Sequence, residues 1–324
     1  MNDRTFPMEA APTVDQGQCV EKMQGHWLLA RAGKRVLRPG GLPLTRRMLR
    51  ALTITPDDRV VEFAPGLGVT AGMVLRQRPA KYWAVERETA AAEQLRRRLP
   101  RAAAEVVVGS AESSGLPDHC ATAVFGEAML TMQSNAQKNR IVGEARRLLA
   151  PGGRYAIHEL CLVPDEIPGP VRQEIQAAMS KEIHVGVQPL CKKEWVALME
   201  QNGFKVIWSG EEPMHLLEPS RLLKDEGLPG MLRMAFNLAV HCLSLGGLKP
   251  SPSRRRLQRV FRISWGDVGV PAGRAHSLRD PAALGVDNKV SACRISGGSG
   301  ATDTGSDPRH LRAARGAHTE GARV

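Results

Sequence analysis

The sequence is poor in aromatic residues, which make up 4% of its 324 residues. Proteins that bind single-stranded nucleic acid usually stack bases on aromatic side chains, so this composition argues against a nucleic-acid partner. Long apolar runs are also lacking, and none approaches the ~18 residues that a membrane-spanning helix needs. Hydrophobic residues make up 42% of the sequence and charged residues 24%, a balance typical of a globular protein with a substantial core.

The cysteines form no cluster. Each of the six lies more than four residues from the next. They lack the spacing of a zinc site, and we predict no metal. Residues 1–18 contain no basic group beside an apolar stretch, so we expect no secretory signal. Unpaired thiols without such a signal predict a reduced, cytoplasmic protein.

The 45 Lys and Arg residues outnumber the 33 Asp and Glu residues, which gives a formal net charge of +12. Much of the excess lies in clusters such as Arg96–Arg98 and Arg254–Arg256, on the exposed faces of predicted helices. A solvated surface is the simplest interpretation, and attraction to anionic lipid is the alternative. We therefore expect no nucleic-acid partner and at most weak peripheral contact with a membrane. The sequence makes no prediction of the oligomeric state.

From residue 59 onward, short β-branched segments alternate with longer helical patterns. The predicted strands are residues 59–64, 82–86, 104–108, 121–125, 154–158 and 204–208, and the predicted helices between them are 69–78, 88–99, 134–149 and 192–202. Strands that alternate with helices pair in parallel through right-handed crossovers. The sequence therefore predicts a doubly wound, mostly parallel α/β sheet, with helices on both faces and a ligand site at the carboxyl ends of the strands.

Three regions follow from this pattern. Residues 1–41 are predicted to form a helical N-terminal extension, and residues 42–262 form the α/β domain with helical insertions at 219–226 and 231–245. From residue 263 to 324 the sequence has no Phe, Tyr or Met, is rich in glycine and shows no period. This composition predicts a disordered tail.

The loop between the first strand and its helix is rich in glycine. Gly66 and Gly68 allow a sharp turn and a close approach of the backbone to a ligand, and the next helix directs free N–H groups at it. This loop also satisfies the G-x-G-x-x-A fingerprint of nicotinamide dinucleotide enzymes at Ala71. However, Glu62 precedes the loop, and its carboxylate suits an ammonium group and would repel a pyrophosphate. Glu86 ends the second strand and can accept hydrogen bonds from ribose hydroxyls.

Four motifs together resemble a known family. They are E-F-A-P-G-L-G from Glu62, V-E-R ending at Arg87, G-S-A-E-S-S-G-L-P-D at residues 109–118, and L-L-A-P-G-G-R at residues 148–154. In this order they resemble class I S-adenosylmethionine-dependent methyltransferases, and most of all the group that includes the ubiquinone/menaquinone-biosynthesis and other small-molecule enzymes. The resemblance covers residues 42–208.

The resemblance implies roles for individual residues. S-adenosylmethionine would be the cofactor, with its methionine moiety held by Glu62 and the backbone of Ala64, Gly66 and Gly68. Its ribose would lie at Glu86. The adenine would lie beside the residues Arg87, Ser110, Ala111 and Glu112.

This chain departs from the family pattern at three points. The family often has glycine in place of Ala64 and aspartate in place of Ser110. Its antiparallel last strand also has no convincing counterpart after residue 260, where residues 263–268 are the best and still poor match.

The remaining candidates concern the methyl acceptor. His158 and Glu159 end the fifth strand, and alternation places them on opposite sides of the sheet. His158 is the candidate general base, because the ordinary pKa of histidine is near neutral, and Glu127 is the second candidate. Glu159, Gln133, Met129 and His26 are candidates for contact with the acceptor, although core packing is the simpler interpretation of the methionine.

The predicted function is methyl transfer from S-adenosylmethionine to a small acceptor that is apolar or lipid-like. Two alternatives stay open at this point. One is a nicotinamide-dependent Rossmann oxidoreductase, and the other is a binding protein that keeps a methyltransferase fold without catalysis.

Overall fold

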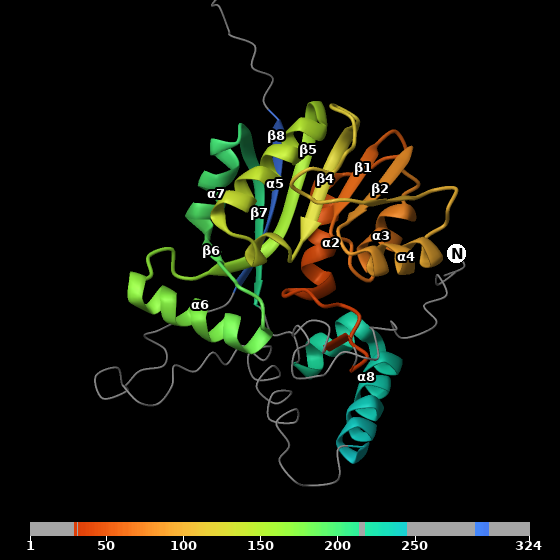
Figure 1. Ribbon diagram of the computed structural model, residues 1–324, viewed down its shortest axis with the longest axis vertical. Coiled ribbons are helices and arrows are strands. Elements are labelled where there is room, and N and C mark those ends of the chain that lie inside the picture. The colour runs from red at the N-terminus through yellow and green to blue at the C-terminus, as the bar shows by residue number, and fades with distance from the viewer. Residues whose placement is uncertain (1–28, 31, 214–217, 245–288, 298–324) are drawn as a thin grey trace, which may run out of the picture.

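The computed structural model describes residues 29–30, 32–213, 218–244 and 289–297, which form a sheet with helices on both of its faces (Figure 1). The strands are β1 (Arg59–Phe63), β2 (Lys81–Glu86), β3 (Glu105–Val108), β4 (Ala121–Glu127), β5 (Leu149–Leu162), β6 (Leu190–Cys191), β7 (Phe204–Pro213) and β8 (Lys289–Gly297). Their order in the sheet is β3-β2-β1-β4-β5-β8-β7, with β6 beside β5. All pairs are parallel except those of β8. The predicted doubly wound α/β fold is confirmed.

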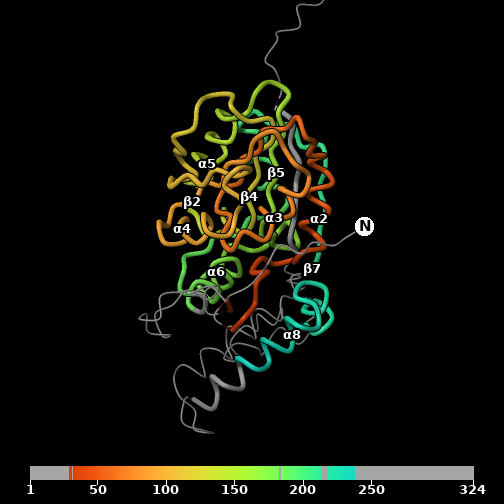
Figure 2. Tube along the Cα trace, turned by 90° about the vertical axis from the view of Figure 1, so that its right-hand side faces the viewer, coloured from red at the N-terminus to blue at the C-terminus, as the bar shows by residue number. Residues whose placement is uncertain are grey.

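The helices follow the strands along the chain. They are α2 (Gly41–Leu52), α3 (Val69–Leu75), α4 (Thr89–Arg98), the 3-10 helix η1 (Leu130–Met132), α5 (Asn135–Leu148), α6 (Gly169–Ile183), α7 (Lys192–Gln201) and α8 (Pro219–Ser244). Ser134 caps α5 in a reciprocal arrangement with Gln137. Helix α8 contains a kink at Gly227, which separates the two helical patterns predicted for this region. Helices α6 and α8 lie beyond one end of the strands (Figures 1 and 2).

Alternation along the strands divides the core between the two faces of the sheet. Val61 packs with residues of α5 and α7, such as Ile141 and Trp195. Val60 packs on the other face with residues of α2 and α3, such as Leu44 and Val74. Because side chains alternate between the two faces, only polar residues that point to the same face can meet at the strand ends.

Helix α6 was not predicted from the sequence. Ile175 and Met179 are buried on one side of it, but charged and small residues surround them, so the helical period is weak. Within the described part of the chain, no helix is long and apolar enough to cross a membrane.

Strand β8 corrects the expectation for the tail. Residues 289–297 lie within the region predicted to be disordered, yet they form an antiparallel strand between β5 and β7. Cys293 pairs with Ile157 on one side and with Ser209 on the other. The strand depends on two partners that are distant in sequence, so its short local pattern did not reveal it. The rest of the predicted tail lies outside the described residues.

Candidate functional site

Three acidic or basic side chains meet at the carboxyl ends of neighbouring strands. Glu62, Glu127 and His158 each lie two residues beyond a core residue on the face covered by α2 and α3. Alternation therefore directs all three toward that face. Glu62 is 3% exposed and His158 is fully buried, and the side chain of Glu127 is 7% exposed.

The glycine-rich loop has the backbone that its sequence predicts. Ala64, Gly66 and Gly68 all have positive φ angles, of 50°, 54° and 75°. At Gly66 an added Cβ would meet no atom within 4 Å, whereas at Gly68 it would lie 3.0 Å from Leu95. The loop therefore turns sharply and presents bare backbone on one side while it packs tightly on the other. Ala64 adopts a backbone conformation that suits glycine better, and glycine is the residue that the family often has at this position.

Glu86 lies against this loop. Its carboxylate accepts a hydrogen bond from the N–H of Glu88 at 3.1 Å and interacts with the backbone N–H groups of Arg87 and Gly66. Burial raises the pKa of Glu86 above its ordinary value, and these backbone hydrogen bonds only partly offset that rise. The structure thus brings Glu86 and Gly66 together, as the resemblance implied.

Glu62 is the least compensated acid of the site. Among the described residues, one hydroxyl, that of Tyr82, donates a hydrogen bond to its carboxylate. Burial raises the pKa of Glu62 to about 8, and the nearby charge of Glu127 adds to the rise against the effects of Tyr82 and Arg38. Near neutral pH this carboxyl group is mostly protonated, so a cation placed beside it would displace the proton.

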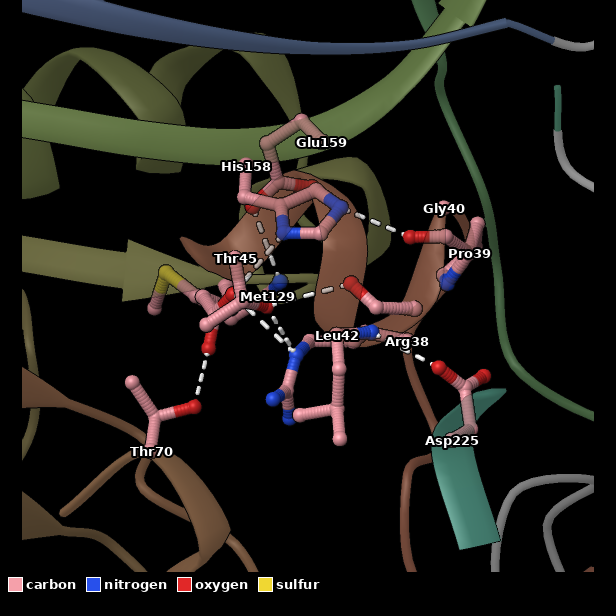
Figure 3. A network of polar contacts seen from close by, with 12 residues as sticks. Arg38, Pro39, Gly40, Leu42, Thr45, Thr70, Met129, His158, Glu159 and Asp225 are labelled. Atoms are coloured by element: carbon pink, nitrogen blue, oxygen red, sulfur yellow. Dashed lines mark hydrogen bonds and ion pairs between the residues drawn. The ribbon is translucent and has the colours of Figure 1, made fainter. Parts of the chain in front are cut away.

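Glu127 is held by four donors, and the residues that supply them are labelled in Figure 3. The hydroxyl groups of Thr45 and Thr70 donate to it at 2.6 and 2.5 Å, Nε of Arg38 lies at 3.1 Å, and Nδ1 of His158 lies at 2.8 Å. Burial alone would raise the pKa of Glu127, but Arg38 and His158 outweigh it and lower the pKa to about 2. Glu127 is therefore an ionised carboxylate that joins α2, α3, β4 and β5.

His158 uses both ring nitrogens in the same network (Figure 3). Its Nε2 lies 2.6 Å from the carbonyl oxygen of Pro39, which can only accept, so Nε2 carries a proton. Its Nδ1 lies 2.8 Å from the carboxylate of Glu127. Both ring nitrogens of His158 are thus occupied by oxygen atoms of the protein. A general base needs a free lone pair, and this arrangement offers none.

Glu159 points to the other face of the sheet, so the predicted separation of these two neighbours is confirmed. Its carboxylate accepts hydrogen bonds from the N–H groups of Met129, Leu130 and Thr131 at 2.8–3.0 Å. Glu159 therefore holds the turn after β4 that begins η1. Met129 is 6% exposed and belongs to the core, which favours the packing interpretation of its side chain.

The loop after β3 lies next to Glu86, because the N–H of Gly109 donates to the carbonyl of Glu86 at 3.0 Å. Oγ of Ser110 accepts a hydrogen bond from the N–H of Glu112 at 3.1 Å. Glu112 in turn forms an ion pair with Arg140 of α5 at 2.5 Å, which lowers the pKa of Glu112. Ala111 packs against the core.

Arg87 and Gln133 are the two further candidates that the structure describes. The side chain of Arg87 is exposed and lies 3.6 Å from the carboxylate of Glu88. Gln133 donates from Nε2 to the carbonyl of Met129 at 3.2 Å and lines a cavity of about 480 Å³ between α5 and α6. His26 lies outside the described residues. The described residues contain no group of three or more His, Cys, Asp or Glu side chains that could hold a metal ion.

Residues 32–41, which we call the strap, form one wall of the site. Helix α8 holds the strap through its backbone. Glu226 accepts from the N–H of Val36 at 2.9 Å, Asp225 accepts from the N–H of Leu42 at 2.8 Å, and Arg221 donates to the carbonyl of Gly40 at 2.9 Å. The strap supplies Arg38 and the carbonyl of Pro39 to the network around Glu127.

Four residues of the site were not predicted from the sequence: Arg38, Thr45, Thr70 and Tyr82. Arg38 and Thr45 precede the first predicted strand and belong to no family motif. Thr70 lies inside the glycine-rich loop region, where a hydroxyl at a helix start could have been noticed. Tyr82 contacts Glu62 across two strands, and that pairing depends on a register that the sequence alone does not provide.

The model of a family described as a methyltransferase domain matches residues 61–157. The chain is 31% identical over 217 residues to an uncharacterized protein of Haemophilus influenzae, covering 66% of this chain and 84% of that protein.

Solved structures share the fold. A candidate sarcosine dimethylglycine methyltransferase from Galdieria sulphuraria is 10% identical, with a TM-score of 0.55 and coverage of 84% of this chain and 97% of that chain. A candidate methyltransferase from Bacillus halodurans is 13% identical, with a TM-score of 0.51 and coverage of 79% and 99%.

Proposed function

We propose that the chain, whose residues 61–157 match a methyltransferase domain, is a class I S-adenosylmethionine-dependent methyltransferase that methylates a small acceptor with an apolar body. The observation that carries the cofactor assignment is the pair of buried, incompletely compensated carboxylates, Glu62 and Glu86, on either side of a bare glycine loop. These two acceptors suit a ligand that brings one ammonium group and two ribose hydroxyls. A nicotinamide dinucleotide would instead bring a pyrophosphate next to Glu62.

The residues at the site fit the cofactor. Glu62 would receive the ammonium group, and Glu86 would accept hydrogen bonds from the ribose. Nη2 of Arg38 is buried without a hydrogen-bond partner among the described residues, and it is available for the carboxylate of the methionine moiety. The loop at residues 109–112, adjacent to Glu86, would border the adenine.

When bound, S-adenosylmethionine supplies an electrophilic methyl group on a sulfonium centre. The task of the protein is to align the acceptor with that methyl group and to exclude water. We assign His158 and Glu127 to positioning, since the network that they form fixes the strap against β4 and β5. The earlier hypothesis of a general base is weakened by the two acceptors on His158. An acceptor that is already nucleophilic fits this site better.

The acceptor would enter near η1. Met132 and Val187 line the 480 Å³ cavity together with several glutamine amides. An acceptor with an apolar body and a neutral hydrogen-bonding group would match these side chains. The closer resemblance to ubiquinone/menaquinone-biosynthesis enzymes stays a prediction.

Ligand binding tests the proposal directly. S-adenosylhomocysteine should bind and raise the melting temperature through mass action, whereas NAD should not. Isothermal titration calorimetry with both ligands decides between the two cofactors. Stabilisation by NAD alone would contradict the proposal.

A variant tests the role of His158. If it is a base, His158→Gln should slow methyl transfer by roughly 10²–10⁴ with an unchanged KM. If it positions the strap, the loss should appear largely as a raised KM and a lower melting temperature. Thr53→Ala, on the surface at the end of α2, serves as the control for handling and folding.

A further inference from the structure

Helix α8 has its polar and apolar faces reversed relative to an ordinary surface helix. Its charged residues Arg221, Asp225 and Glu226 face the protein, where they hold the strap. Beyond the kink at Gly227, three large apolar residues face outward instead. Leu228, Leu232 and Phe236 are 59%, 63% and 68% exposed.

These three residues follow one another at intervals of four and so lie along one side of the helix. The opposite side is occupied. Met234 is 4% exposed, Arg233 donates to the carbonyl of Gly33 at 3.1 Å, and Nδ2 of Asn237 lies 3.5 Å from the carbonyl of Ala32. The helix is therefore fixed to the strap in an orientation that keeps the apolar side outward. A continuous exposed apolar stripe of this kind marks an interaction surface.

We propose that this outer face of α8, formed by Leu228, Leu232 and Phe236, docks on the surface of a lipid bilayer that contains anionic lipids. The position of the helix permits it, because α8 lies at one extremity of the described molecule, beyond the ends of the strands (Figures 1 and 2). An interfacial helix of this type buries its apolar side in the boundary between headgroups and acyl chains.

The net positive charge of the protein favours an anionic bilayer as the partner of the outer face of α8. The protein has a formal net charge of +12, which attracts it to an anionic surface. The acidic residues of α8, Asp225 and Glu226, are turned inward, and the charged residue exposed on the helix is Lys224. The last seven residues of the helix, 238–244, include no Asp, Glu, Lys or Arg. A second copy of the chain would bring the same positive charge and be repelled.

The inference goes beyond methyl transfer and does not require it. It does connect to the site, because the strap that α8 holds supplies Arg38 and Pro39 to the network around Glu127. A bilayer beneath α8 would therefore lie close to a wall of the site, where an acceptor with an apolar body could be supplied from the lipid phase.

Flotation with vesicles tests the docking surface. The full-length protein should bind vesicles of phosphatidylcholine that contain a minority of phosphatidylglycerol, and it should bind pure phosphatidylcholine less. Leu232→Ser with Phe236→Ser should weaken binding at least about tenfold, since full burial of such a side chain changes an equilibrium constant by about that factor or more. Val108→Ser with Ile207→Ser is the matched control, because those residues are 44% and 46% exposed outside α8. This control should bind like the unaltered protein.

A second readout guards against a folding defect in the variants. Phe236→Trp should show a blue shift of its fluorescence on vesicles and quenching by brominated lipid. Equal flotation of the α8 variant and the control, or no shift of this tryptophan, would overturn the proposal. Concentration-dependent dimerisation that the α8 substitutions abolish, without vesicle binding, would assign the face to a second copy instead. Binding of S-adenosylhomocysteine without lipid reports separately on the proposed function.

Discussion

Glu62 and Glu127 are buried acids on the same face of the same sheet, yet the protein treats them in opposite ways. Glu127 has four donors and a pKa lowered to about 2. Glu62 has one described hydroxyl donor and a pKa raised to about 8. The number of donors that the protein itself supplies therefore distinguishes a structural acid from a ligand-binding acid at a strand end. An acid whose acceptor positions are filled from within holds the fold, whereas an acid left short of partners is suited to a ligand that supplies them.

Removal of Glu127 should have the largest effect on stability. Glu127→Ala would leave the guanidinium of Arg38 buried without its counter-charge and Nδ1 of His158 without its partner, which should cost roughly 3–5 kcal/mol. Urea denaturation followed by circular dichroism measures the loss. A change below about 1 kcal/mol would place Glu127 with the ligand-binding acids and remove the contrast with Glu62.

Removal of Glu86 should act on binding more than on folding. Glu86→Ala should weaken the affinity for S-adenosylhomocysteine by roughly 1.5–3 kcal/mol for each lost hydrogen bond to the ribose, as an upper range. Calorimetry gives the dissociation constant, and Glu88→Ala is a neighbouring control with an exposed side chain. An unchanged dissociation constant would show that Glu86 only supports the loop at Gly66.

The raised pKa of Glu62 predicts that both stability and ligand affinity depend on pH. The ordinary pKa is 4.5 and the folded value is about 8, so the folded protein binds this proton more tightly than the unfolded chain does. The resulting stability is complete below pH 4.5 and is lost as the pH rises through 8. Ligand affinity should change the other way and rise from pH 6 to 8, because the ammonium group of S-adenosylhomocysteine requires the ionised carboxylate.

The variant Glu62→Gln separates these two effects. It should flatten the fall of the melting temperature between pH 5 and 8 and weaken ligand binding at every pH. Calorimetry in buffers with different ionisation enthalpies should detect proton release by the unaltered protein at pH 7 and none from Glu62→Gln. Equal proton release from both would mean that Glu62 does not face the ligand.

The smallest effect is expected at Glu112. Its ion pair with Arg140 is partly exposed, so Glu112→Gln should change stability by about 0–1 kcal/mol. Binding of S-adenosylhomocysteine should also change little if the ion pair only fastens the loop to α5. A large loss of affinity would move Glu112 into the group of ligand-binding acids.

Local sequence was sufficient where a residue and its neighbours determine the structure. The alternation from Arg59 to Trp208 predicted the strands and their mostly parallel pairing, and the glycine pattern predicted the sharp turn at Gly66 and Gly68. It was insufficient where partners are distant. The contact of Arg38 with Glu127 depends on how the strap and α2 pack on the sheet. The carboxylate of Glu226 in α8 accepts hydrogen bonds from backbone N–H groups that are 190 and 191 residues away in the sequence.

Residues 289–297 are the last part of the sheet to leave the ribosome, although they fill a position inside it. Until they emerge, β5 and β7 have no common partner, and each presents a row of unpaired backbone N–H and C=O groups. Edges of this kind attract other chains. Any chain that ends before residue 289, through proteolysis or early termination, would keep these two open edges and should aggregate even with every residue of the cofactor loops intact.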